Sequence, residues 1–268
     1  MNKPRPWLYW AVLSVLCLLG VSCCKQQQKD PFRYKVAIIG NPSNPDIRYD
    51  ESQMQALKDL GYNTLQLNIA WGARPADEPL NLEDILYVDG IGSREKADQR
   101  LQAIKERARI AKKWGFRTLF HFGAPRVDSL YKILTPDLID IATEKNSIQK
   151  KEIVDKYVSL LKRLKQEVPE LDDIEVYTFD QDAWVANEFG NGPTDRDIPL
   201  HERIPAFLQA LTGTWAEVSS DGMVWWEPWE ISGTDLCLHS VASDSELRDV
   251  SAFQHSGSTT EPAGGCLV

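Results

Sequence analysis

The sequence predicts an α/β fold of the (β/α)8 TIM-barrel type that is incomplete, with about five strand–helix units. Short apolar runs alternate with segments of helical period from residue 33 to residue 232. One motif at the junction between a helix and a strand occurs twice within this region. Long polar segments follow several of the strands, where barrels carry their functional loops. These observations favour a parallel sheet with helical connections.

Each expected strand is a short run of apolar, β-branched or aromatic residues bounded by turn-forming or polar residues. The runs cover residues 36–40, 64–71, 118–122, 174–180 and a last segment that begins at Val224. Because Pro228 would interrupt the ladder of a sheet, we expect the last strand to stop there.

Four amphipathic helices are expected between these strands. Asp50 is a suitable N-cap for the first helix, and Gly61 stands where a left-handed residue ends a helix. Pro199 precedes the fourth. Each helix carries one apolar stripe whose residues recur at helical spacing. The stripes are Met54, Leu57 and Leu60 in the first helix; Ala97, Leu101, Ile104, Ala108 and Ala111 in the second; Val154, Tyr157, Val158, Leu161 and Leu164 in the third; and Ile204, Phe207, Leu208, Leu211 and Trp215 in the fourth.

The repeated junction motif has the form apolar-Gly-aromatic-x-Thr-Leu. It occupies residues 60–65 and 114–119. In both copies glycine supplies the left-handed cap, the aromatic residue closes the turn, and Thr-Leu begins a buried strand. Two such units predict parallel strands joined by helical crossovers, either in a barrel or in an open doubly wound sheet.

Two features favour the barrel. No G-x-G-x-x-G phosphate loop follows the first strand, where the sequence instead reads Asn41-Pro42-Ser43. Long polar segments follow the second, third and fourth strands at residues 72–93, 123–137 and 181–198. Such segments are typical of the working rim of a barrel.

The periodic pattern stops at Ser232. Residues 233–268 are rich in Ser, Gly and Thr and have no sustained helical or strand stripe. A full barrel needs eight units of roughly 30 residues each, and this tail is too short for the missing ones. The alternatives are an open five-stranded sheet and a truncated barrel with a non-native tail over residues 233–268. We favour truncation.

The N-terminal segment has the pattern of a bacterial lipoprotein signal. Lys3 and Arg5 precede an apolar run over residues 7–21, which is short for a membrane span, and small residues then lead to a cysteine. We expect residues 1–22 to be the signal peptide and Cys23 to be lipidated, with Cys24 as the alternative. Gly20 departs from the leucine that is usual there, and an ordinary secretory signal is the competing interpretation.

This interpretation predicts the location of the protein. Residues 23–32 form a polar tether, and residues 33–232 form the partial barrel domain. We therefore expect a lipoprotein anchored to a membrane of the bacterial cell envelope. Outside the cytoplasm a disulfide between Cys237 and Cys266 is permitted, although the sequence does not establish it.

Composition excludes some classes of function. Without Lys3 and Arg5, 28 Lys and Arg remain against 39 Asp and Glu, a formal net charge of −11. A chain this acidic is a poor binder of nucleic acid, because phosphate neutralisation needs a basic face. No C-x-x-C or H-E-x-x-H motif is present, so we expect neither a metal site nor a cofactor.

The segment Val224-Trp-Trp-Glu-Pro-Trp-Glu-Ile-Ser232 combines aromatic rings with carboxylates at the end of the last strand. Aromatic faces cover the apolar side of a pyranose, and carboxyl pairs hydrolyse glycosidic bonds. Trp225, Glu227 and Trp229 share one face of the strand by its period of two. Glu227 is therefore a candidate catalytic carboxylate. The competing interpretation is a buried aromatic cluster with surface glutamates.

Candidate partners for Glu227 lie after the fourth strand. Asp180 and Asp182 share one face, and two carboxyls there can separate their pKa values and divide acid and base roles. Strand-end aspartates that cap backbone amides are the simpler explanation. The catalytic candidates are Glu227, Asp180, Asp182 and Glu188. The candidates for substrate binding are Trp71, His121, Arg126, Trp184, Trp229 and Glu230.

Several of these motifs resemble a known group of proteins. The lipoprotein signal, Tyr177–Trp184, Ile198–Pro205 and Trp225–Glu230 are together similar to (β/α)8-barrel proteins of the glycoside hydrolase superfamily, and more narrowly to surface lipoproteins of Bacteroides-type bacteria. In retaining barrel glycosidases the acid/base follows strand four and the nucleophile follows strand seven. The resemblance assigns the first role to Asp180, Asp182 or Glu188. No seventh strand is found in this sequence.

The expected function is a lipid-anchored, glycoside-hydrolase-like protein that acts on or binds poly- or oligosaccharides. An active site and a site inactivated by truncation are both kept open. The alternatives are a non-catalytic carbohydrate-binding lipoprotein and a structural surface lipoprotein without a ligand.

Overall fold

The computed structural model describes most of the region predicted to fold. The described residues are 32–40, 48–69, 78–126, 144–177, 194, 197–198 and 200–227. The chain divides into two units, Met1–Tyr34 and Lys35–Val268, and all helices and strands below belong to the second. The expected signal peptide and the proposed tail, with all five cysteines, lie outside the described residues.

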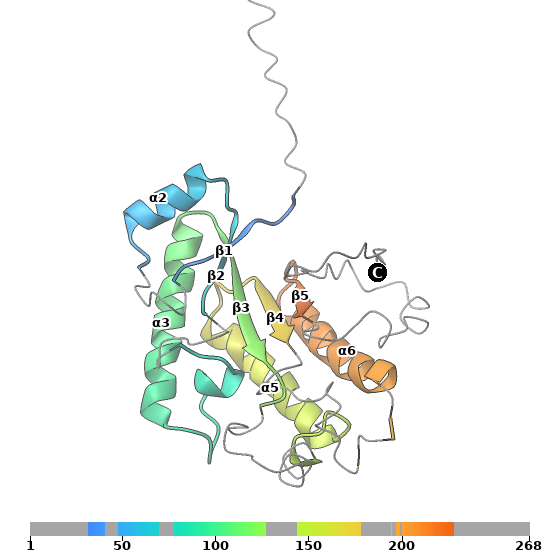
Figure 1. The fold of residues 1–268 in the computed structure, drawn as a ribbon. Helices are drawn as coiled ribbons and strands as arrows, with labels where there is room; N and C mark the ends of the chain where they lie inside the picture. The colour runs from blue at the N-terminus through green and yellow to red at the C-terminus, as the bar shows by residue number, and fades with distance from the viewer. Residues whose placement is uncertain are drawn as a thin grey trace, which may run out of the picture. The chain divides into compact units, whose positions relative to one another are not determined.

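Five parallel strands form one sheet (Figure 1). Their spatial order is the same as their order in the chain, β1-β2-β3-β4-β5. The strands are β1 (Val36–Ile38), β2 (Thr64–Gln66), β3 (Arg117–Gly123), β4 (Asp173–Tyr177) and β5 (Val224–Glu227).

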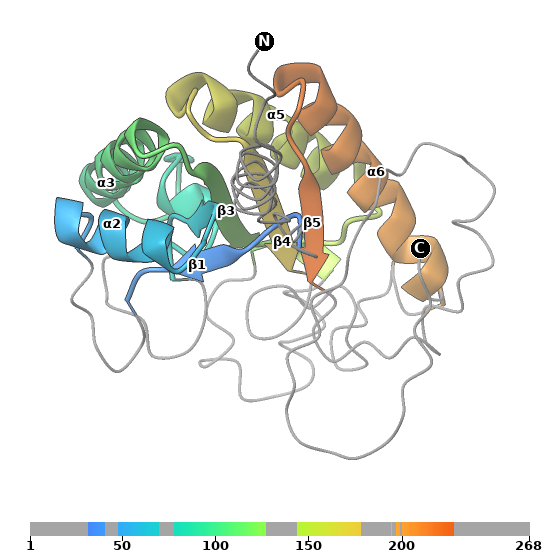
Figure 2. The same cartoon turned by 90° about the horizontal axis from the view of Figure 1, so that it is seen from above.

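Helices connect the strands and lie along one side of the sheet, as Figure 2 shows. They are α2 (Glu51–Asp59), α3 (Arg94–Lys113), α5 (Lys151–Glu167) and α6 (Leu200–Val218), with a short 3₁₀ helix, η1 (Leu82–Asp84), before α3. α5 and α6 pack against each other, and α6 also contacts β5.

The order of the strands decides between the two predicted topologies. A doubly wound sheet reverses its direction of growth, so that right-handed crossovers place helices on both faces. Here each strand is added beside the previous one in the same direction. Right-handed crossovers then place every helix on the same face, which is the winding of a barrel. The prediction of a partial (β/α)8-type fold is confirmed for the described residues.

The face of the sheet under the helices is apolar and forms the main core. Even-numbered residues of β3 and β4 point into it, because side chains alternate along a strand. They pack against apolar residues of the helices. Many members of this core are fully buried; they include Leu65, Phe120, Phe122, Ile174, Val176, Tyr157, Leu161, Phe207 and Trp215.

The predicted helix caps and glycine turns are confirmed. The Asp50 carboxylate accepts a hydrogen bond of 2.8 Å from the Gln53 amide at the start of α2. Gly61 and Gly115 have φ angles of 80° and 70°, in the left-handed region where glycine carries no steric cost. Lys58 at the end of α2 donates to the Gly115 carbonyl over 3.1 Å, which ties the two repeated junctions together.

Two expectations need correction. Of the strand expected over residues 64–71, the structure describes residues 64–69, and within these only Thr64–Gln66 pair as a strand, because the Asn68 side chain then binds the backbone of β3. The segment expected to be a long polar loop, residues 72–93, contains η1 and four buried leucine or isoleucine side chains: Leu80, Leu82, Ile85 and Leu86. Apolar residues scattered without period gave no sequence signal for this packing.

In the part of the chain that the structure describes, no helix is both long and apolar enough to span a bilayer. The apolar run at residues 7–21 lies outside that part.

Gly222, just before β5, lies close to the backbone that precedes β4 and to the side chain of Trp215 in α6. A Cβ at this position would lie 2.5 Å from the Asp172 carbonyl oxygen and 2.6 Å from Nε1 of Trp215. We predict that Gly222→Ala lowers the free energy of unfolding by about 1–3 kcal/mol, because overpacking displaces backbone. Urea denaturation measures the change.

Gly213, inside α6, is the matched control. A Cβ there meets nothing within 4 Å. Gly213→Ala should therefore raise stability by about 0.5–1 kcal/mol through helix propensity. Equal effects of the two substitutions would contradict this description of the β5 junction.

Candidate functional site

The face of the sheet away from the helices carries a row of polar and aromatic residues. In the register of the strands, His121 of β3 pairs with Glu175 of β4, which pairs with Trp225 of β5. Two residues nearer the strand ends, Gly123, Tyr177 and Glu227 form the next row. We call His121, Glu175 and Glu227 the inner-face cluster. It lies at the carboxyl ends of the strands, where barrels place their active sites.

His121 and Glu227 are in contact. Nε2 of His121 lies 3.1 Å from Oε2 of Glu227, and the side chains are 7% and 26% exposed. The carboxylate oxygen is close enough for an ion pair, and this contact contributes to the raised pKa of His121. Apart from Glu227, buried Nε2 has no hydrogen-bond partner among the described residues. A buried donor of this kind is unfavourable unless a further group satisfies it.

The charges of the cluster act on one another. Burial acts to lower the pKa of His121, but the nearby carboxylates of Glu175 and Glu227 outweigh it, so this pKa lies above its usual 6.5. Burial raises the pKa of Glu175; the charge of His121 opposes the rise, and the charge of Glu227 adds to it. The pKa values of His121 and Glu175 are therefore both raised, and the negative charge of Glu175 and the positive charge of His121 favour each other.

Asn68 holds the backbone of His121 in place. Its carboxamide oxygen accepts from the His121 amide over 3.1 Å, and its nitrogen donates to the His121 carbonyl over 2.8 Å. The same nitrogen donates to the Pro79 carbonyl over 2.9 Å. The side chain thus replaces a peptide group of β2 and keeps β3 paired beyond the end of that strand.

Tyr177 forms an aromatic wall beside the histidine. The Tyr177 and His121 rings meet edge to face, with centroids 5.3 Å apart. Gly123 leaves the room for this ring, because a Cβ there would lie 3.0 Å from a ring carbon of Tyr177. Trp225, on the same face of the sheet, is 5% exposed. Aromatic surface and carboxyl groups therefore occur together on this face.

Arg126 belongs to a different network. Its guanidinium lies 2.8 Å from Oδ1 of Asp84 in η1, and its amide donates to the Tyr157 hydroxyl over 2.6 Å. That hydroxyl donates to Glu83 over 3.1 Å, and burial raises its pKa well above the usual value. Lys156 also pairs with Glu83. These contacts tie the segment after β3 to η1 and α5.

Of the residues predicted to form a site, the structure brings His121 and Glu227 together. It places Arg126 against Asp84, and its role in substrate binding stays a prediction. The other candidates lie outside the described residues; they are Asp180, Asp182, Glu188, Trp71, Trp184, Trp229, Glu230, Cys23 and Cys24.

Sequence reasoning missed Glu175 and Asn68. A signal for Glu175 was present, because a single carboxylate interrupts the otherwise apolar strand Ile174-Glu-Val-Tyr177. Side chains alternate between the two faces along the whole of a strand, and this alternation places Glu175 on the same face as Asp173 and Tyr177. Asn68 had no comparable signal, since its role depends on a neighbouring strand.

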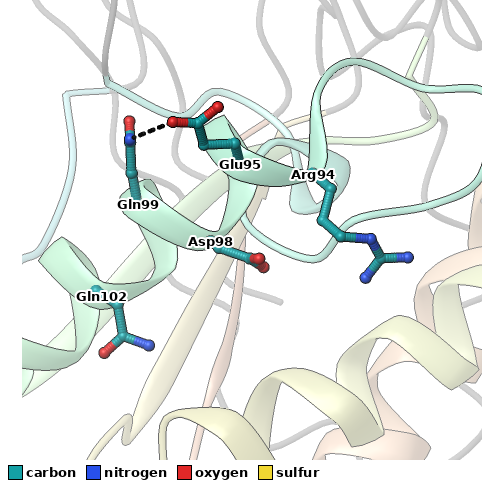
Figure 3. Close-up of a pocket in the computed structure, with 5 residues that line it drawn as sticks. All are labelled: Arg94, Glu95, Asp98, Gln99 and Gln102. Atoms are coloured by element: carbon teal, nitrogen blue, oxygen red, sulfur yellow. Dashed lines mark hydrogen bonds between the residues drawn. The ribbon is translucent and has the colours of Figure 1, made fainter.

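A surface depression lies elsewhere. It has a volume of about 740 Å³ and lies on the first turns of α3, where it is lined by Arg94, Glu95, Asp98, Gln99 and Gln102 (Figure 3). All five side chains are exposed, and Gln99 donates to Glu95 over 3.4 Å along the helix. Because it contains no buried ionisable group, we regard it as a solvated helix face.

Within the described ranges, no group of three or more His, Cys, Asp or Glu side chains is arranged to hold a metal ion.

No protein-family model matches the sequence, and no curated protein matches it. Several solved structures are similar. Endo-glycoceramidase II from Rhodococcus sp. is 14% identical, with 73% of this chain and 49% of that chain covered and a TM-score of 0.43. A GH5_18 protein from Bifidobacterium longum, in complex with Manb1-4GlcNAc, is 14% identical, with coverages of 76% and 46% and a TM-score of 0.45.

An O-GlcNAc hydrolase from Thermobaculum terrenum is 16% identical, with coverages of 74% and 35% and a TM-score of 0.42. This chain thus spans about half or less of the length of these three proteins. The similarities are distant, and the winding of the sheet is what establishes the fold.

We predict that Asn68→Ala lowers the free energy of unfolding by about 1–3 kcal/mol, because it leaves buried backbone groups of His121 and Pro79 without their partners. Chemical denaturation measures the loss. Gln102→Ala on the exposed face of α3 is the control and should change stability by no more than about 0.5 kcal/mol. A loss from Asn68→Ala as small as the control's would show that the carboxamide does not hold β3.

Proposed function

We propose that this chain is a glycoside-hydrolase-like protein that acts on glycans, with Glu227 as a working carboxylate. The observation that carries the proposal is the inner-face cluster, a carboxylate at the strand ends in contact with a buried histidine. Charged groups on the inner face of a parallel sheet are costly unless they serve a ligand or a reaction. These groups lie at the carboxyl ends of the strands, where barrels place their active sites, and this position supports a role in a reaction.

The chemistry that fits is acid–base hydrolysis by a pair of carboxyl groups. One carboxylic acid gives its proton to the leaving oxygen as the bond between C1 and that oxygen breaks. A carboxylate assists the water that supplies a hydroxyl to C1, directly or after a covalent intermediate, and takes the proton of that water. The net reaction is the addition of one water across the bond. Glu227 is the proposed carboxylate, and Asp180, Asp182 or Glu188 its proposed partner.

Aromatic residues line the proposed sugar site. Tyr177 and Trp225 lie on the same face of the sheet as Glu227, and because they are only 8% and 5% exposed they form the buried floor of that site. The apolar face of a pyranose packs on such rings, while its hydroxyls bind carboxylates and imidazoles. Trp71, Trp184 and Trp229 are proposed to extend this surface, with Glu230 at its rim. The ligand class that follows is a poly- or oligosaccharide.

We predict that Glu227→Gln reduces glycan hydrolysis by about 10²-fold or more, because an amide can neither accept the proton nor stabilise positive charge at C1. Release of reducing ends from a panel of plant and host polysaccharides measures the activity. Glu217→Gln is the control, since Glu217 is an exposed residue of α6 paired with Lys162 over 3.0 Å; it should leave turnover unchanged.

The same panel separates a glycan hydrolase from a protein that only binds glycans. Retained binding with lost turnover in Glu227→Gln supports the enzyme. Binding without turnover in the unaltered chain would replace the proposal with a non-catalytic glycan-binding protein. Neither binding nor turnover on any member of the panel would overturn both.

We also propose that Cys23 is lipidated and anchors the protein in the bacterial cell envelope. The support is the signal-like sequence before it, from Lys3 to Ser22. In cells fed an alkyne fatty acid, Cys23→Ser should abolish labelling of this protein, whereas Cys24→Ser should retain it. Loss of labelling in Cys24→Ser alone would move the anchor to Cys24, and no labelling of the unaltered protein would remove it.

A further inference from the structure

We infer that Glu175 is a positioning residue of the inner-face cluster: from β4 it keeps the ring of His121 doubly protonated, so that Nε2–H and the carboxylate of Glu227 together bind one neutral hydroxyl group of the ligand. The inference rests on the proposed function, because it assigns the chemistry of one subsite of the same site.

The first step is placement. Glu175 and His121 are direct neighbours in the β3–β4 register, and both side chains point to the face opposite the helices. Adjacent strands are about 4.8 Å apart, so side chains that share a register position are in each other's electrostatic range. Glu227 is one row nearer the strand ends, on the next strand.

The second step is the surroundings of the imidazole. From β2, Asn68 contributes a neutral carboxamide that binds the backbone of His121. From β4 come Glu175 and the edge of the Tyr177 ring, and from β5 comes Glu227. The charged groups that act on His121 in the described part of the chain are thus two carboxylates, and both favour the imidazolium.

The third step is the unsatisfied donor. His121 is 5% exposed, and apart from the carboxylate of Glu227 its Nε2 has no hydrogen-bond partner among the described residues. Glu227 is more exposed than His121, so a ligand reaches the pair from the rim. A hydroxyl group can accept a hydrogen bond from Nε2–H and donate its own proton to the carboxylate, which satisfies both partners.

The fourth step concerns specificity. An anionic ligand group at this position would meet the Glu227 carboxylate, which lies only 3.1 Å from Nε2. Like charges at such a distance repel strongly in a partly buried site. The subsite should therefore bind a neutral hydroxyl group and exclude a sugar that carries a carboxylate or a sulfate at this position.

NMR titration of the histidine rings tests the inference on the full mature chain without any ligand. The signal of His121 is assigned by its loss in His121→Asn. In the unaltered protein we expect this ring to titrate above 6.5, and in Glu175→Gln we expect its midpoint to move to lower pH. Glu175→Asp should restore part of the shift, and Glu217→Gln should leave the midpoint where it was.

The outcomes are separable from those of the glycan assays. A His121 midpoint below 6.5 in the unaltered protein overturns the inference even if Glu175→Gln does not fold. So does a midpoint that Glu175→Gln leaves unchanged, whatever that variant does to hydrolysis. If the midpoints behave as expected but no glycan is bound or cut, Glu175 still tunes His121 and the proposed function is what fails.

The pH dependence of binding provides the second readout. The imidazolium form of His121 is present below its pKa in the folded protein and is lost as the pH rises through that pKa. A plot of glycan affinity against pH should therefore have an alkaline limb, along which affinity falls as His121 loses its proton. In Glu175→Gln the limb should move to lower pH by the same amount as the NMR midpoint. A limb that stays in place while the midpoint moves would contradict the role of Nε2–H in binding.

Discussion

The direction in which the sheet grows is the constraint on which the rest of this structure depends. Strands β1 to β5 are added in chain order, all parallel, and right-handed crossovers then leave no choice about where the helices go. One face of the sheet becomes the apolar core, with Phe120, Phe122, Ile174 and Val176 under the helices. The other face is free of helices in the described part of the chain, and it is there that His121, Glu175 and Glu227 meet. A sheet that reversed its growth would have covered both faces with helices and had no place for this cluster.

The inner-face cluster can be buried because its opposite charges partly offset the cost of removing each charged group from water. Burial alone would keep His121 neutral and Glu175 protonated, but each reduces the burial penalty of the other's charged form. Asn68 fixes the backbone of His121 beyond the end of β2, so the Cα from which the ring extends has a defined position without help from a ligand. Such preorganisation favours ligand binding, because ordering a group only when the ligand binds costs entropy and weakens the affinity. The network of Arg126, Asp84, Tyr157 and Glu83 makes the adjacent segment after β3 similarly fixed.

Local sequence signals predicted the local features well. Asp50, Gly61 and Gly115 act as predicted because a cap or a left-handed turn depends on a few neighbouring residues. The period of two placed Trp225 and Glu227 on one face, and the strand register agrees. Whether the sheet was singly or doubly wound depended on strand order, which no local pattern carries. Three features arise from contacts between distant parts of the chain, which local patterns do not encode. The Asn68 side chain binds the backbone of β3, Glu175 lies beside His121, and the segment around η1, whose sequence predicts a polar loop, buries its leucines.

The central claim is that ligands bind at the carboxyl ends of β3, β4 and β5 and not on the solvated depression of α3. Mapping of backbone amide shifts, with gluco-, manno- and galacto-oligosaccharides added to the protein, tests it most directly. The account predicts that the amides of Gly123, Tyr177 and Glu227 shift in a saturable manner while that of Gln99 does not. Shifts confined to the α3 depression, or no saturable shift at the strand ends with any of these oligosaccharides, would contradict it.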